Sequence, residues 1–198
     1  MSGSVHDHTI GGHGRWRWLK ATIAAFNANK TSWFGLVVFL FVLLAALLAP
    51  VLALHDPVEQ DILMKLKPPQ ETYFLGTDYF GRDILSRLLY GARISLVIGI
   101  ASTLVALVIG SLIGVLAGWY GGRFDVIMMQ AMDMLLAFPS LILGLILVAM
   151  LGPTITNIVV AIALTSIPSF ARIARAPTIA VKEREFIQAG RALGFSDL

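Results

Sequence analysis

The segment ISLVIGIASTLVALVIGSLIGVLAGWYGG, residues 94–122, contains 29 consecutive residues without an Asp, Glu, Lys or Arg. A helix of this length, at 1.5 Å per residue, is longer than the roughly 30 Å hydrocarbon core of a bilayer. Two more uncharged segments lie on either side of it, residues 33–54 and residues 134–171. The three segments predict an all-α, polytopic membrane protein and argue against a soluble globular enzyme.

The third uncharged segment is too long for one span and too short for three, and Gly152-Pro153 divides it. Pro139 and Pro168 lie on either side of that division, and each is expected to kink its helix because proline removes a backbone hydrogen bond. Four spans are therefore expected, at about residues 33–54, 94–120, 128–151 and 154–171.

The other segments are polar and predict the orientation of the chain. The tail at residues 1–32, the turn at residues 121–126 and the segment after the fourth span together carry 10 Lys and Arg residues. The opposite side, residues 55–93 and the Gly152 turn, carries 5. Because the side richer in Lys and Arg is usually cytoplasmic, the N-terminus and residues 177–198 are expected in the cytoplasm. Within the extracytoplasmic segment, residues 83–90 alternate charged and leucine residues and predict an amphipathic helix at the membrane surface.

Small residues recur at every fourth position of the second span. This spacing keeps them on one helix face, and in lipid such a face lets a second helix approach closely. The predicted helix-packing ridge consists of Ser102, Ala106, Gly110, Gly114 and Gly118.

Residues that could perform catalysis are scarce. No Lys follows a Gly, so the chain lacks the phosphate-binding loop GxxxxGK[ST], and it contains no cysteine. Ser102, Thr103 and Ser166 lie in spans without a His or an acid beside them, so their hydroxyls are expected to bond to the backbone. No catalytic residue is assigned.

Metal, cofactor and nucleic-acid sites are not expected either. His6, His8 and His13 could hold a metal ion, but they lie in a polar terminus where nothing fixes their geometry. The chain has no basic cluster interleaved with aromatic residues. Asp133 borders the third span, where an ion pair with Arg172 or Arg175, or a helix cap, is expected.

The segment after Pro177 is predicted to contain an amphipathic helix. Its acids come early and Arg191 comes late, as the helix dipole favours, and Gly194 is a suitable helix stop. Such a helix fits a groove on another protein, or alternatively packs on its own chain. Its apolar face, at positions i, i+3, i+4 and i+7, consists of Phe186, Ala189, Gly190 and Leu193.

Residues 75–96, LGTDYFGRDILSRLLYGARISL, resemble the segment before the core domain in ABC-transporter permeases of the dipeptide/oligopeptide/nickel family. Ala49-Pro50, His55-Asp56-Pro57, and Asp133 with Ala137-Phe138-Pro139 are also similar to that family. Residues 185–197 resemble its cytoplasmic EAA loop, although the EAA triplet falls on Gln188-Ala189-Gly190.

The resemblance implies the transmembrane domain of a type I ABC importer, with four of six spans present and residues 94–198 forming part of that domain. Because the chain ends inside the EAA loop, it is expected to be a fragment or a truncated product. The loop would dock on an ATPase subunit. The docking residues implied are Glu185, Phe186, Gln188, Ala189, Gly190, Leu193 and Gly194.

The resemblance also implies a location and partners. The location is the cytoplasmic membrane of a bacterium or archaeon. The partners are a homologous permease subunit, two ATP-binding subunits, an extracytoplasmic solute-binding protein and the lipid bilayer. No residue identifies the solute or its path.

Three alternatives differ from this interpretation. An ATP-independent channel or secondary carrier needs polar side chains facing a lumen, and the spans offer only Ser, Thr, Gln130 and Asn157 besides Asp133. An intramembrane enzyme needs a nucleophile with a base, or metal ligands, at membrane depth. The third alternative is that the chain is an inert assembly remnant, because the last two expected spans are missing.

Overall fold

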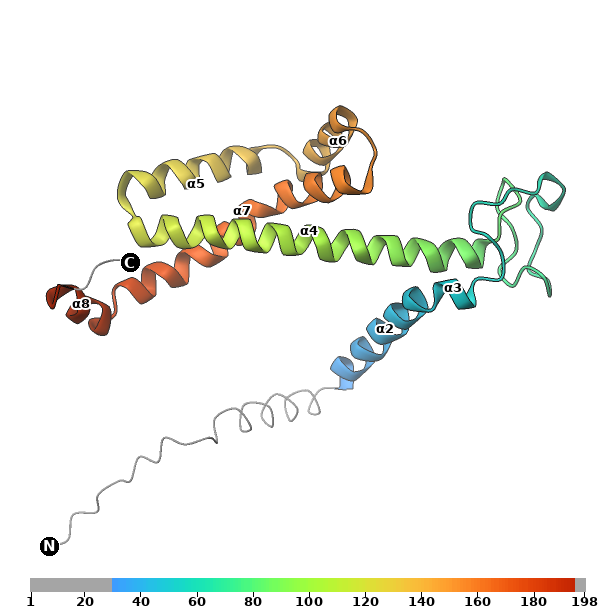
Figure 1. The fold of residues 1–198 in the computed structure, drawn as a ribbon, viewed down its shortest axis with the longest axis horizontal. Helices are drawn as coiled ribbons and strands as arrows, with labels where there is room; N and C mark the ends of the chain where they lie inside the picture. The colour runs from blue at the N-terminus through green and yellow to red at the C-terminus, as the bar shows by residue number, and fades with distance from the viewer. Residues whose placement is uncertain (1–29, 195–198) are drawn as a thin grey trace, which may run out of the picture. The chain divides into compact units, whose positions relative to one another are not determined.

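The computed structural model describes residues 30–194, which form helices joined by turns and loops (Figure 1). The prediction of an all-α protein is confirmed, since the described part holds only two isolated β-bridges besides its helices. Contacts divide the chain into two units, Met1–Arg93 and Ile94–Leu198. The three histidines considered as metal ligands lie outside the described residues.

The first apolar segment forms two helices, α2 (Lys30–Leu47) and α3 (Ala49–Leu52), where one span at residues 33–54 is expected. The interruption follows from Pro50, which has no backbone N–H to donate in the first turn of α3. Beyond α3, residues 53–83 are mostly irregular and include the 3₁₀ helix η1 (Ile62–Met64), whose first turn is capped by the Asp61 carboxylate.

Helix α4 (Ile84–Tyr120) is continuous over 37 residues. The expected surface helix at residues 83–90 and the expected span at residues 94–120 are therefore parts of one helix. Asp83 accepts a hydrogen bond from the backbone N–H of Ser86 at the start of α4, and no proline follows until Pro139. Gly121, with φ +67°, ends the helix in a turn.

The third expected span, residues 128–151, is instead two helices, α5 (Gly122–Ala137) and α6 (Ser140–Leu151), which bend by 87° at their junction. Phe138 between them has extended backbone angles, φ −86° and ψ 133°. A residue before proline avoids the helical region, so Pro139 ends α5 as well as kinking the chain.

Helix α7 (Ile155–Lys182) extends 11 residues past the end expected for the fourth span at residue 171. Thr154 caps its first turn by accepting a hydrogen bond from the N–H of Asn157. Pro168 and Pro177 lie inside the helix without ending it. The short α8 (Glu185–Ala192) follows, so the helix predicted after Pro177 begins only at Glu185.

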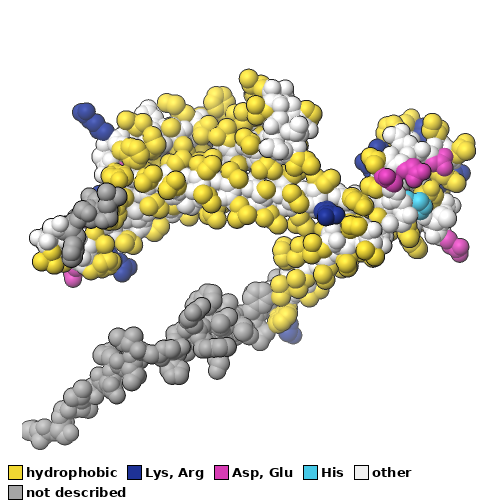
Figure 2. All heavy atoms as spheres, in the orientation of Figure 1, with side chains coloured by type: hydrophobic (Ala, Val, Ile, Leu, Met, Phe, Trp, Pro, Cys, Tyr) yellow, Lys and Arg dark blue, Asp and Glu magenta, His cyan; other side chains and the backbone are white. Residues whose placement is uncertain are grey.

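Three helices, α2, α4 and α7, are long and apolar enough to cross a membrane, and the bent pair α5 and α6 passes the same test together. The described part thus offers three spans, or four if the bent pair crosses as one. Figure 2 shows hydrophobic side chains over much of the visible surface of these helices, as expected for lipid-facing or subunit-facing elements.

The core of the second unit is rich in alanine. Buried side chains of α4, α5 and α7 form its central cluster, which consists of Ala106, Met132, Ala163, Ile167 and Ala171. Three ridge glycines of α4 lie against α7. A Cβ on Gly114 would lie 2.1 Å from the carbonyl oxygen of Ala171, and a Cβ on Gly110 would lie 2.6 Å from that of Ile167. The two backbones are therefore nearly in contact.

We expect Gly114→Ala to lower the thermal midpoint (Tm) of the purified protein in detergent, because the added methyl group collides with backbone and overpacking costs about 1–3 kcal/mol. The matched control is Gly99→Ala on the same helix, where a Cβ meets nothing within 4 Å. Removing a helix-interior glycine there should be neutral or gain about 0.5–1 kcal/mol. Circular dichroism measures the Tm of both variants. Equal Tm values would contradict the close approach of α4 and α7.

Candidate functional site

The five ridge residues lie on α4, and the structure places all five on packed surface. Ser102 and Ala106 are buried, and its three glycines approach α7; for Gly118 the nearest groups are the carbonyl oxygen of Arg175 and the side chain of Thr178. The hydroxyl of Ser102 donates to the backbone carbonyl of Ile98, at 2.7 Å.

The hydroxyls of Ser102 and Ser166 bond to the backbone of their own helices. Ser166 donates to the carbonyl of Ile162 at 2.9 Å, as Ser102 does within α4. Within residues 30–194, no three His, Cys, Asp or Glu side chains are placed to hold a metal ion. The local bonding predicted for Ser102 and Ser166 is therefore observed.

Two ion pairs connect α5 to α7. Asp133 pairs with Arg172 at 2.5 Å, which is one of the two arginine partners expected for it. Arg175 instead pairs with Asp125, donating from Nε and Nη2 to both carboxylate oxygens at 2.5 Å. Sequence analysis missed this second pair, because the two residues are 50 positions apart and only the fold brings them together.

The helix α8 projects apolar side chains into solvent. The side chains of Phe186 and Leu193 are 63% and 77% exposed, whereas Gly190 on the same face is half-buried. Gly194 follows with φ +84°, which is the left-handed conformation of a helix stop. This exposed face at the end of the long helix α7 can pack against another protein.

Gln188, the first residue of the altered EAA triplet, has a structural contact of its own. Its side-chain amide donates to the backbone carbonyl of Glu183 at 3.2 Å, at the C-terminal end of α7. A carboxylate at this position would have no proton to donate. The amide therefore joins α8 to the end of α7, which the sequence pattern did not predict.

The motif at residues 75–96 forms the junction between the loop and α4. The buried carboxylate of Asp83 accepts a hydrogen bond from the Ser86 hydroxyl at 2.5 Å, and that hydroxyl accepts one from the N–H of His55 at 3.3 Å. The Thr77 hydroxyl bonds the backbone of both Met64 and Lys67. These contacts fix the segment that follows α3 to the first turn of α4.

Asp78 stabilises the turn before α4 with its carboxylate. Oδ1 accepts hydrogen bonds from the backbone N–H groups of Phe80 and Arg82 at 2.8 and 3.0 Å, and Oδ2 accepts one from Nε of Arg82. Partial burial, the largest influence, raises the pKa of Asp78. The backbone N–H groups and the Arg82 guanidinium together outweigh it, so the net pKa lies below the ordinary 3.8.

The arrangement of long apolar helices and a short exposed terminal helix defines a multi-pass helical membrane protein. Comparison with known families supports a closer assignment. Residues 110–198 match the family model "Binding-protein-dependent transport system inner membrane component". Residues 17–69 match the N-terminal transmembrane domain of oligopeptide transport permease C.

Individual relatives agree with both matches. A di/tripeptide transport system permease protein of Pseudomonas aeruginosa is 41% identical over 186 residues, covering 91% of this chain and 61% of the relative. A dipeptide transport system permease protein of Alkalihalophilus pseudofirmus is 38% identical, covering 85% and 56%. A glutathione transport system permease protein of Pectobacterium atrosepticum is 46% identical, covering 65% and 43%.

The chain belongs to the family of binding-protein-dependent inner-membrane transport components, the permease subunits of ABC transporters. Its helical domain has the type I ABC importer fold. The chain spans about three fifths or less of the length of the curated relatives named above.

The lowered pKa of Asp78 predicts an acid-labile turn. The charged carboxylate stabilises the turn above the unfolded-state pKa of about 3.9, and this contribution is lost as pH falls through the lower folded-state pKa. Hydrogen exchange at the Phe80 and Arg82 amides, corrected for intrinsic rates, should therefore accelerate as pH falls from about 5 through the lowered folded-state pKa of Asp78. In Asp78→Asn the exchange should be fast already at the higher pH. Exchange in that variant as slow as in the unaltered protein would contradict the role of the charge.

Proposed function

We propose that this chain forms half of the translocation pathway of an ATP-driven importer for peptides or a similar small solute. A homologous permease subunit forms the other half, two ATP-binding subunits bind on the cytoplasmic side, and an extracytoplasmic solute-binding protein delivers the solute. The family description, which names binding-protein-dependent transport, and the peptide and glutathione permeases among the relatives support this proposal. The chain itself is non-catalytic, and separate subunits hydrolyse ATP.

The observation that carries the proposal is the exposed apolar face of α8. Phe186 lies on α8, a helix of eight residues whose first turn is acidic, and Leu193 lies in the turn directly after it. A helix this short has little stability by itself, so an exposed apolar face on it is suited to a groove in a partner. The ATP-binding subunit is the partner in this proposal, and α8 is the coupling helix.

Movement of α8 would reach the membrane helices through α7. Gln188 connects α8 to the end of α7, and the pairs Asp125–Arg175 and Asp133–Arg172 connect α7 to α5. The glycines of α4 leave no space between α4 and α7. A partner that displaces α8 would therefore move the three helices together, and the break at Pro139 allows α6 to change its angle.

We expect Phe186→Glu with Leu193→Glu to reduce co-purification of the ATP-binding subunits about tenfold or more, since each substitution places a charge where an apolar side chain would be buried in the partner. The matched control is Ile62→Glu, which changes an equally exposed apolar residue in the first unit. Recovery of the ATP-binding subunits equal to that of the control would contradict the docking role of α8.

The proposed orientation places the N-terminus and α8 in the cytoplasm. Because the chain has no cysteine, Gln188→Cys introduces a unique label site. A membrane-impermeant thiol reagent should leave this cysteine unmodified in intact cells and modify it after the membrane is opened. Modification in intact cells would show that the topology is the opposite of the proposed one.

A further inference from the structure

The two ion pairs between α5 and α7 differ in how fully their charges are used. Asp125 gives both carboxylate oxygens to Arg175, and its side chain is only 14% exposed. Asp133 and Arg172 meet through one oxygen and one nitrogen, Oδ1 and Nη2, and their side chains are 61% and 54% exposed. The first pair is a structural clamp, whereas the second retains an oxygen and guanidinium N–H groups for a further partner.

An exposed charge pair on helices of this kind is not suited to lipid tails. Asp133 and Arg172 lie on α5 and α7, which both belong to the candidate spans. Charged side chains in spans almost always face a water-filled cavity or the interior of a helix bundle. Gln130, one helical turn before Asp133, is also exposed and polar. This face of the two helices is therefore suited to a water-filled cavity or to the interior of a helix bundle, and not to lipid tails.

Arg172 continues a stripe along one face of α7. Positions separated by alternating steps of four and three share a helix face. The stripe consists of Ile158, Ile162, Thr165, Ser169 and Arg172. It is apolar at its first end, carries hydroxyls in the middle and ends in the guanidinium group, so its polarity changes along its length.

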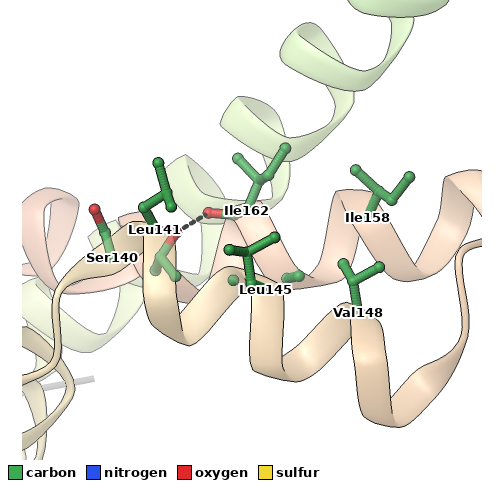
Figure 3. Close-up of a pocket in the computed structure, with 9 residues that line it drawn as sticks. Ser140, Leu141, Leu145, Val148, Ile158 and Ile162 are labelled. Carbon is green, nitrogen blue, oxygen red and sulfur yellow. Dashed lines mark hydrogen bonds between the residues drawn. The ribbon is translucent and has the colours of Figure 1, made fainter.

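The apolar end of the stripe borders a groove between α6 and α7 of about 530 Å³. Figure 3 shows Leu141, Leu145 and Val148 of α6 beside Ile158 and Ile162 of α7. Gly144 and Ala161 lie in the same lining and keep it open. Thr165 belongs both to this groove and to the stripe, so the stripe runs from the groove to Arg172.

We propose that the stripe, with Asp133 and the groove, is a binding surface for a small zwitterionic peptide on its way through the membrane. Asp133 binds the terminal ammonium group, Arg172 binds the terminal carboxylate, and the groove between α6 and α7 holds an apolar side chain. This inference rests on the proposed function, because it assigns the substrate path of the same permease.

The charge assignment favours a short peptide. Asp133 and Arg172 contact each other, so both termini of the ligand must lie close together at this pair. An extended chain of two residues spans at most roughly 7 Å, whereas a longer extended chain would carry one terminus away from the pair.

Binding to the purified transporter in nanodiscs without its solute-binding protein tests the assignment of charges. The probes are leucyl-leucine, its N-acetyl derivative and its C-terminal amide. Saturation-transfer NMR measures the binding of each probe. The free dipeptide should bind about tenfold or more tightly than either derivative, because each derivative loses a charge-assisted contact. Asp133→Asn should abolish the preference over the N-acetyl form, and Arg172→Met should abolish the preference over the amide.

The matched control is Asp125→Asn, which removes an acid from the same helix and should leave both preferences unchanged. Preferences retained in Asp133→Asn and Arg172→Met would overturn the proposal, as would no dipeptide binding by the unaltered transporter. Equal loss in Asp125→Asn would show that the ion pairs act only on the fold, and would overturn it too.

A second measurement does not depend on altering the charges. Ser169→Cys places a unique thiol on the stripe, and Ile173→Cys places one on a neighbouring face that is 69% exposed. A charged, water-soluble thiosulfonate should modify the cysteine of Ser169→Cys, and should do so more slowly when leucyl-leucine is present. It should not modify the cysteine of Ile173→Cys. An unreactive Ser169→Cys would mean that the stripe faces lipid or another subunit. That result overturns this inference, while loss of ATP-binding subunits in the α8 variants would still support the proposed function.

Discussion

The close approach of α4 and α7 is the constraint on which the second unit depends. Gly110 and Gly114 bring backbone against backbone, and any larger side chain at Gly114 would meet the carbonyl oxygen of Ala171. In a membrane this contact cannot rely on the hydrophobic effect, because lipid is as apolar as leucine. Dispersion contacts of closely fitted surfaces take its place, so the spacing of the glycines fixes where α7 lies and hence what α7 carries.

Helix α7 then joins every functional feature of the unit. One face meets α4, a second is fixed to α5 by Arg175 and Arg172, and its first turns border the groove with α6. Its last turn is followed by α8, which Gln188 joins to the carbonyl of Glu183. A helix held on two faces and free on a third can transmit a displacement along its axis without losing its packing, which is what a coupled permease requires.

Much of this arrangement could be predicted from the sequence, because hydropathy and residue spacing report directly on helices in lipid. The all-α class and the helix stop at Gly194 follow from charge and glycine positions, and Arg172 is one of the two arginines predicted as partners of Asp133 besides a helix cap. Helix boundaries could not be predicted equally well, since the loss of apolar residues marks where water begins and a helix continues past that point. Helix α7 therefore runs on to Lys182, and α4 begins ten residues before its uncharged segment. Pro139 predicts where the helix breaks but not the angle of the break. The angle of 87° depends on the backbone of Phe138.

The Asp125–Arg175 pair lay beyond sequence analysis because 50 residues separate its members, and no periodicity connects two different helices. Sequence alone also gives Asp125 and Asp133 the same description, an acid near the start of a span. The fold distinguishes them physically. Both oxygens of Asp125 bond to one arginine, and its side chain is mostly buried. Its charge is therefore used in a structural contact. An acid bonded through one oxygen and open to its surroundings keeps a share of its charge, and in a spanning helix that charge requires either water or a ligand to stabilise it.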